Sequence, residues 1–111
     1  MTVDEIYLML ANLLNDAIEE DFQFANIYID RLDKYVASEG HYTNLHNEQI
    51  KIEELGFRFA NAMAIHELHS ITTEGGHNRW NKLKFTLYPT GKFEMEFIWD
   101  QEYQDMVDNV K

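Results

Sequence analysis

The chain has 111 residues and a formal charge of −11 at pH 7, because twenty acidic side chains outnumber nine lysines and arginines. That length corresponds to one domain, and a hydrophobic content of 45% is enough for a buried core, which excludes a disordered acidic tail. Proteins bind nucleic acids and anionic membranes through lysine and arginine, so the acidic charge disfavours both as partners. The absence of cysteine excludes disulfides, thiolate metal sites and cysteine nucleophiles.

The first predicted element is a helix over about residues 3–20. Thr2 and Glu5 have the spacing of a capping box, in which the threonine side chain accepts from the backbone three residues on and the glutamate reaches back. Apolar residues follow at helical spacing. They include Ile6, Leu10, Leu13 and Ala17.

Two patterns compete in the next stretch. The run 24–29 is rich in aromatic and β-branched residues and favours a strand, whereas residues 28–36 also fit helical spacing. We predict two strands, over about Phe22–Arg31 and residues 34–43, because Leu32-Asp33 is typical of a break between them.

A second helix is predicted over about residues 47–71. Asn47 can serve as its N-cap, and Glu48 would lie in the first turn, where the helix dipole favours acids. Apolar residues from 52 to 63 share one broad face, and Gly75-Gly76 follows the expected end.

A hairpin is the next predicted element. Residues 82–88 and 92–99 alternate apolar and polar side chains, and residues 89–91, Pro-Thr-Gly, suit a tight turn between them. The alternation predicts one buried face, with Lys84 able to pair with Glu94 or Glu96 across the other face.

Asp100 can then cap a last short helix that ends at about Asn109. The predicted order is therefore helix, two strands, helix, two strands, helix. Such an order favours a single α+β domain over residues 1–111, with an antiparallel sheet of two hairpins and helices packed on one face.

The first five residues lack the basic segment and apolar run of a signal peptide. The sequence also contains no apolar stretch of about 18 residues, the minimum that spans a bilayer. We therefore expect a cytoplasmic protein.

No motif indicates an enzyme. Catalytic carboxyl pairs need two environments that separate their pKa values, and Glu94 and Glu96 are expected to share one solvated strand face. Gly75-Gly76 lacks the flanking residues of a phosphate loop, and neither Ser38 nor Ser70 lies in a nucleophile elbow. We expect a protein that binds rather than catalyses and that needs no cofactor.

Acidic residues form two clusters that indicate docking. The first crowds the C-terminal end of the first predicted helix and consists of Asp16, Glu19, Glu20 and Asp21. The helix dipole disfavours each carboxylate there by about 0.3–1 kcal/mol, and such local conflicts are typical of functional surfaces. The second cluster combines acids with aromatic anchors and consists of Trp99, Asp100, Glu102 and Tyr103. The competing interpretation is that both are solvated faces that keep the protein soluble.

Four cations gather around the predicted hairpin. They are Arg79, Lys82, Lys84 and Lys92. We expect them to pair with Glu94, Glu96 and neighbouring acids rather than to bind phosphate, because a phosphate-binding surface needs a larger basic stripe.

Both ends of the chain resemble the YezG-like immunity proteins. The resemblance is carried by Trp80, the turn Gly91-Lys92-Phe93 and the strand end Trp99-Asp100, together with a first helix that leads into Phe22. It implies a bacterial immunity protein or antitoxin that neutralises a cognate toxin without catalysis. Such toxins are commonly nucleases delivered by secretion or contact-dependent systems. The basic, phosphate-binding surface of a nuclease would suit an acidic inhibitor.

Two alternative functions stay open. His66 and His69 lie three residues apart on the second predicted helix and His77 follows nearby, so a small metal-binding protein or hydrolase could use these three side chains. The zinc-protease motif, however, places its histidines four residues apart. The alternative without a metal site places His66 at the edge of the core and His69 on the surface, with no ligand on either. The other alternative is a self-associating domain whose hairpin edges pair between copies.

Overall fold

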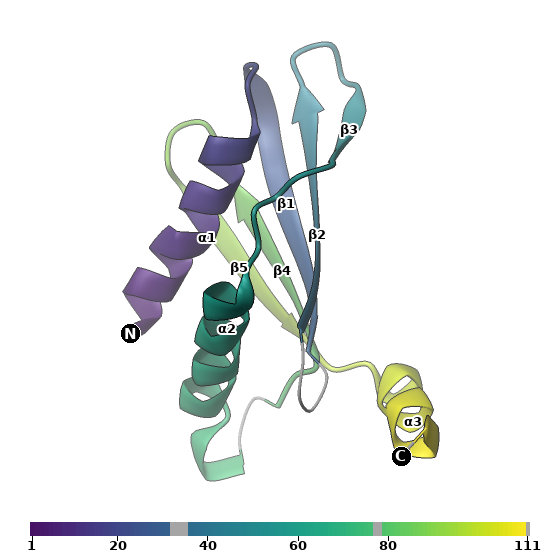
Figure 1. Ribbon diagram of the computed structural model, residues 1–111. Coiled ribbons are helices and arrows are strands. Elements are labelled where there is room, and N and C mark those ends of the chain that lie inside the picture. The colour runs from purple at the N-terminus through teal and green to yellow at the C-terminus, as the bar shows by residue number, and fades with distance from the viewer. Residues whose placement is uncertain (32–35, 77–78, 111) are drawn as a thin grey trace.

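An antiparallel sheet of five strands organises the fold in the computed structural model, which describes residues 1–31, 36–76 and 79–110 (Figure 1). Along the chain the elements are α1 (Val3–Ala17), β1 (Phe22–Arg31), β2 (Val36–Asn44), β3 (Gln49–Ile52), α2 (Phe59–Thr72), the 3-10 turn η1 (Glu74–Gly76), β4 (Lys82–Leu87), β5 (Phe93–Ile98) and α3 (Gln101–Val110). The strands lie in the spatial order β3-β2-β1-β4-β5. The predicted α+β class is confirmed, with the short β3 as an additional strand.

β1 is the middle strand and supplies the centre of the core. Its alternation sends Ala25, Ile27 and Ile29 to the face covered by helices, and all three side chains are fully buried. Ile27 lies opposite Gly40 on β2 and Phe85 on β4. The predicted bounds of β1 are confirmed, whereas the start predicted for β2, at residue 34, lies outside the described residues.

α1 and α2 cover the same face of the sheet (Figure 1). The capping box of α1 is confirmed, because the Thr2 hydroxyl accepts from Glu5 N at 3.1 Å and Thr2 N donates to Glu5 Oε1 at 2.9 Å. The helix ends at Ala17, three residues earlier than predicted. Its apolar stripe of Ile6, Leu10 and Leu14 is fully buried against the sheet.

The prediction for the second helix is wrong over its first part. Residues 49–52 form β3, the chain then runs without regular structure to Arg58, and α2 begins at Phe59. Asn47 does not cap a helix but adopts a left-handed φ of +63° in the β2–β3 turn. That turn is closed by the Asn44 side chain, whose oxygen accepts from the backbone of His46 and Glu48. The spacing of apolar residues here fits a helix as well as a strand, and pairing with β2 decides in favour of the strand.

The predicted β4–β5 hairpin is confirmed. Tyr88 N donates to Lys92 O and Gly91 N donates to Tyr88 O, each at 2.9 Å, and Gly91 takes a φ of +89° that favours glycine. Leu83 and Phe85 point into the core, as expected from the alternation.

α3 stands apart from α1 and α2, beyond the end of β5 (Figure 1). Asp100 caps it as predicted, since its Oδ1 accepts from Tyr103 N at 3.0 Å. No helix among the described residues is long and apolar enough to cross a membrane.

Two leucines of α1 offer a matched test of this packing. Leu10 is 0% exposed and Leu8 is 61% exposed. We expect Leu10→Ala to lower the free energy of unfolding by about 2–5 kcal/mol, because it leaves a cavity under the sheet. Leu8→Ala removes no buried contact and should change it by less than about 0.5 kcal/mol. Urea denaturation measures both, and equal effects would contradict the orientation of α1.

Candidate functional site

The first acidic cluster lies where α1 ends, at one end of the sheet (Figure 1). Ile18 closes the helix by donating its backbone N–H to Leu14 O at 3.0 Å. Asp16 lies in a last helical turn that holds no basic residue, and residues 19–21 form the exposed connection to β1. The carboxylates therefore surround the negative pole of the helix, which is the conflict that the sequence predicts.

One carboxylate of this cluster is fixed to the sheet. The Tyr42 hydroxyl donates to Glu20 Oε2 at 2.6 Å. The hydrogen bond to Glu20, the loss of hydration and the negative charges of Glu20 and Glu19 all raise the pKa of the Tyr42 phenol. Glu20 is thereby anchored to β2, which holds its charge in place at the end of the sheet.

A partly apolar hollow of about 380 Å³ opens beside two of these carboxylates. It is lined by Asn15, Glu20, Asp21, Phe22, Leu45 and Pro89. Leu45 belongs to the β2–β3 turn and is 59% exposed, and Pro89 belongs to the β4–β5 turn. Apolar surface rimmed by charge is typical of a protein-docking site.

Sequence reasoning missed the apolar part of this site. Phe22, Leu45 and Pro89 come from three separate segments that only the sheet brings together. The signal available in the sequence was Leu45, an apolar residue within the polar run Asn44–Asn47, but the predicted helix obscured the turn.

The aromatic residues of the second cluster are engaged within the fold. The Arg79 guanidinium lies 4.0 Å from the centre of the Trp99 ring, and Trp99 Nε1 donates to Gln101 Oε1 at 3.0 Å. Lys82 Nζ lies 4.6 Å from the Tyr103 ring. Burial and then the charge of Asp30 raise the pKa of Tyr103.

Asp100 joins α3 to the sheet. Its backbone N donates to Asn81 Oδ1 at 2.9 Å and its backbone O accepts from Asn81 Nδ2 at 2.8 Å. Its carboxylate caps α3 and lies 3.6 Å from Lys82 Nζ. Glu102, by contrast, is exposed on the first turn of α3. Three of the four residues predicted for docking here therefore also hold the C-terminal helix in place.

The structure does not bring the two acidic clusters together. The first lies beside the β2–β3 and β4–β5 turns, and the second lies at the opposite end of the sheet, beside α3 (Figure 1). The molecule measures 42 Å along its longest axis. A partner would have to cover the length of the sheet to contact both clusters.

The expected pairing of the hairpin cations with acids is confirmed for Lys82, although its partners are neither Glu94 nor Glu96. Lys82 lies 3.7 Å from Asp30 and 3.6 Å from Asp100. Lys84 lies opposite Glu96 in the register, yet its Nζ is placed over the Tyr28 ring at 5.7 Å. Within residues 1–31, 36–76 and 79–110, no ion pair of 4.0 Å or less involves Glu94 or Glu96. Both carboxylates are exposed, and Glu94 contacts the Tyr88 hydroxyl, whose pKa is raised by burial and then by the charge of Glu94 and the hydrogen bond to it.

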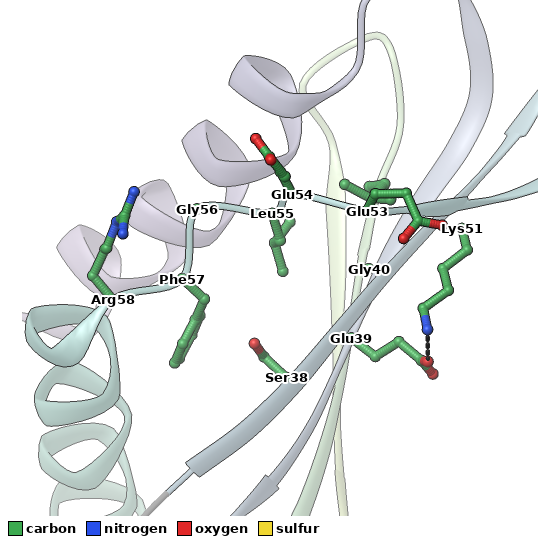
Figure 2. Close-up of a pocket in the computed structure, with 11 residues that line it drawn as sticks. Ser38, Glu39, Gly40, Lys51, Glu53, Glu54, Leu55, Gly56, Phe57 and Arg58 are labelled. Carbon is green, nitrogen blue, oxygen red and sulfur yellow. Dashed lines mark ion pairs between the residues drawn. The ribbon is translucent and has the colours of Figure 1, made fainter.

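A second hollow, of about 650 Å³, lies beside β2 where β3 ends. Figure 2 shows Leu55 and Phe57 pointing into it from the segment that leads to α2, while Glu54 points away. A Cβ added at Gly40 would lie 3.1 Å from Leu55 Cδ1, so this segment packs closely on the strand. The lining combines apolar side chains with a charged rim.

Two of the three candidate metal residues use one ring nitrogen within the fold. His66 Nδ1 accepts from Arg31 Nε at 3.2 Å, and His69 Nε2 lies 3.1 Å from the Trp80 carbonyl, to which it can donate. His77 lies outside the described residues. Among the residues that the structure does describe, no group of three ligating side chains is gathered.

Comparisons with protein-family models and with curated proteins find no match for this chain. The resemblance to YezG-like immunity proteins thus stays a prediction.

The environment of His69 predicts a pH dependence. Burial and then the nearby Arg31 cation lower the pKa of His69 below the ordinary value of 6.5. The unfolded chain then binds the proton more readily, so this contribution to stability is fully present above pH 6.5 and is lost as the pH falls through that value toward the lower folded pKa.

We expect the urea midpoint to fall between about pH 7 and pH 5, and His69→Gln to flatten that dependence. Glutamine keeps an N–H donor for the Trp80 carbonyl but does not titrate. His46→Gln, in the exposed β2–β3 turn, serves as the matched control. If His69→Gln retained the slope of the parent protein, His69 would not be the group responsible.

Proposed function

We propose that this chain is a cytoplasmic immunity protein that binds a basic toxin, such as a nuclease domain, and neutralises it without catalysis. The observation that carries the proposal is the arrangement at the end of α1, where Glu20 and Asp21 line a partly apolar hollow and the exposed Asp16 and Glu19 lie close to them in the chain. The net charge of −11 and the resemblance to YezG-like proteins add support.

The end of α1 is better suited to this role than the corner at α3. Asp16, Glu19 and Asp21 are exposed, and Glu20 is held in place by Tyr42. At the α3 corner, Trp99 and Asp100 already contact Arg79 and Asn81 within the same chain. A docking surface needs side chains that are not already engaged within the fold, so that a partner can cover them, and the end of α1 offers more such side chains than the α3 corner.

Charge and apolar surface would act at different stages of binding. The carboxylates attract a basic partner at long range and raise the association rate, whereas burial of the hollow slows dissociation. Leu45 and Phe22 would supply the apolar contact. A nuclease is the fitting partner class, because its active site must present positive charge to phosphate.

A protection assay tests the function directly. The open reading frame immediately upstream of the gene for this chain is expressed from an inducible promoter, with and without the chain. We expect growth arrest that the chain relieves, together with a stable complex in size-exclusion chromatography. Arrest that the chain does not relieve, or an upstream product without toxicity, would contradict the proposal.

Charge reversal tests the surface. A variant in which Asp16, Glu19, Glu20 and Asp21 are all replaced by lysine should associate with the toxin about 10–100-fold more slowly, with a weaker salt dependence, because steering is lost. Stopped-flow mixing at several ionic strengths measures this. The control reverses an equal number of exposed acids elsewhere, namely Glu53, Glu54, Glu74 and Asp105. Equal rates for the two variants would mean that total charge, not this surface, drives association.

A further inference from the structure

The outer edge of β5 is an unpaired strand edge. Among residues 1–31, 36–76 and 79–110, β5 is the last strand of the sheet and pairs with β4 alone, on its inner side. It follows the β4–β5 turn, whose Pro89 lines the apolar hollow of the acidic end. The edge therefore begins next to the surface proposed to bind the toxin.

The backbone of β5 presents hydrogen-bonding groups outward at alternate residues. Tyr88 N donates to Lys92 O at 2.9 Å, so this pair is hydrogen-bonded. Bonded pairs recur every second residue in an antiparallel ladder, which directs the N–H and C=O groups of Glu94 and Glu96 toward β4. The corresponding groups of Phe93, Met95 and Phe97 point away from the sheet, where a further strand could pair with them.

The side chains of β5 define what such a strand should carry. Glu94 and Glu96 lie on the open face of the sheet, and both are exposed. On the other face Phe93 remains 44% exposed beside Tyr7, at a ring distance of 5.2 Å. An incoming strand would gain most from lysine or arginine opposite the glutamates and from apolar residues opposite Phe93 and Met95.

A second copy of the chain fits this edge poorly. Antiparallel pairing centred on Met95, which uses the full strand, places Glu94 of each copy opposite Glu96 of the other. Like charges directly opposite each other destabilise a strand pair, and charged edges are a common device against self-association.

We propose that the outer edge of β5 accepts an extended, basic segment of the partner as a sixth strand of the sheet. Main-chain hydrogen bonds to Phe93, Met95 and Phe97 would provide affinity, and Glu94 and Glu96 would select positive side chains. The inference rests on the proposed function for the identity of the partner, but the edge itself can be probed without it.

A synthetic peptide of alternating lysine and valine, capped at both ends, is the first probe. In NMR titrations it should shift the amide signals of residues 93–97 and slow their hydrogen exchange. The matched control is the same peptide N-methylated at those alternate residues whose N–H groups would pair with β5. It should bind about tenfold more weakly, because it lacks these donors. Equal binding of the two peptides, or shifts confined to another surface, would overturn the proposal.

Two variants of the chain test the same edge. Met95→Pro removes an N–H that points away from β4, so the existing ladder stays intact, and Met95→Ala controls for the lost side chain. Glu94→Gln with Glu96→Gln removes the charge selection, and Glu53→Gln with Glu54→Gln makes the same charge change at the opposite side of the sheet. We expect the two β5 variants to bind the peptide about three- to tenfold more weakly than their controls.

The outcomes separate the two proposals. If the parent protein, Met95→Pro and Glu94→Gln/Glu96→Gln all relieve toxicity equally well, the proposed function is retained and the addition of a sixth strand is overturned. If the peptide binds at the edge of β5 but the parent protein does not relieve toxicity, the strand addition is retained and the proposed function is overturned. If Met95→Pro does not fold, the glutamine variant still decides. A dimer in sedimentation that the glutamine variant strengthens would show that the edge pairs with a second copy, which also overturns the proposal.

Discussion

The burial of β1 is the constraint on which the rest of the molecule depends. Ala25, Ile27 and Ile29 are fully excluded from water, and their strand is paired on both sides. These side chains cannot take part in a binding surface without loss of the core. Recognition is therefore restricted to what surrounds it: the turns at the ends of the sheet, its outer edges and its open face. The end of α1 with its acidic cluster and the outer edge of β5 are both among these regions.

The distribution of charge follows from the same constraint. A net charge of −11 repels itself, and the sheet gives the carboxylates few places where cations can compensate them. Lys82 is used between Asp30 and Asp100, where it ties β1, β4 and the start of α3 together. The end of α1 receives no such compensation in its last turn. Lys82 thus connects three elements at one end of the sheet, while the carboxylates at the end of α1 have no basic residue in the last helical turn beside them.

Local signals in the sequence were sufficient for the elements whose stabilising contacts are themselves local. The capping box at Thr2, the turn around Gly91 and the cap at Asp100 could each be recognised within a few residues. The segment after Asn47 could not, because its apolar spacing suits both a helix and a strand, and only β2 decides between them. The candidate site divides in the same way. Its carboxylates are neighbours along the chain, but its apolar hollow is assembled from three distant segments.

The two ends of the sheet therefore cannot contribute equally to one interface. At the α3 corner, the Asp100 carboxylate would have to give up its hydrogen bond to Tyr103 N and its ion pair with Lys82 before it could contact a partner, and a lost hydrogen bond to a charged group costs about 1.5–3 kcal/mol. At the α1 end Asp16, Glu19 and Asp21 are exposed and would meet a partner without rearrangement, and the adjoining edge of β5 presents its backbone outward. Preorganised groups lower the cost of association, since less must be ordered on binding. An interface that starts at the acidic hollow and continues along β5 uses preorganised groups throughout, whereas one that includes the α3 corner would first have to dismantle part of the fold.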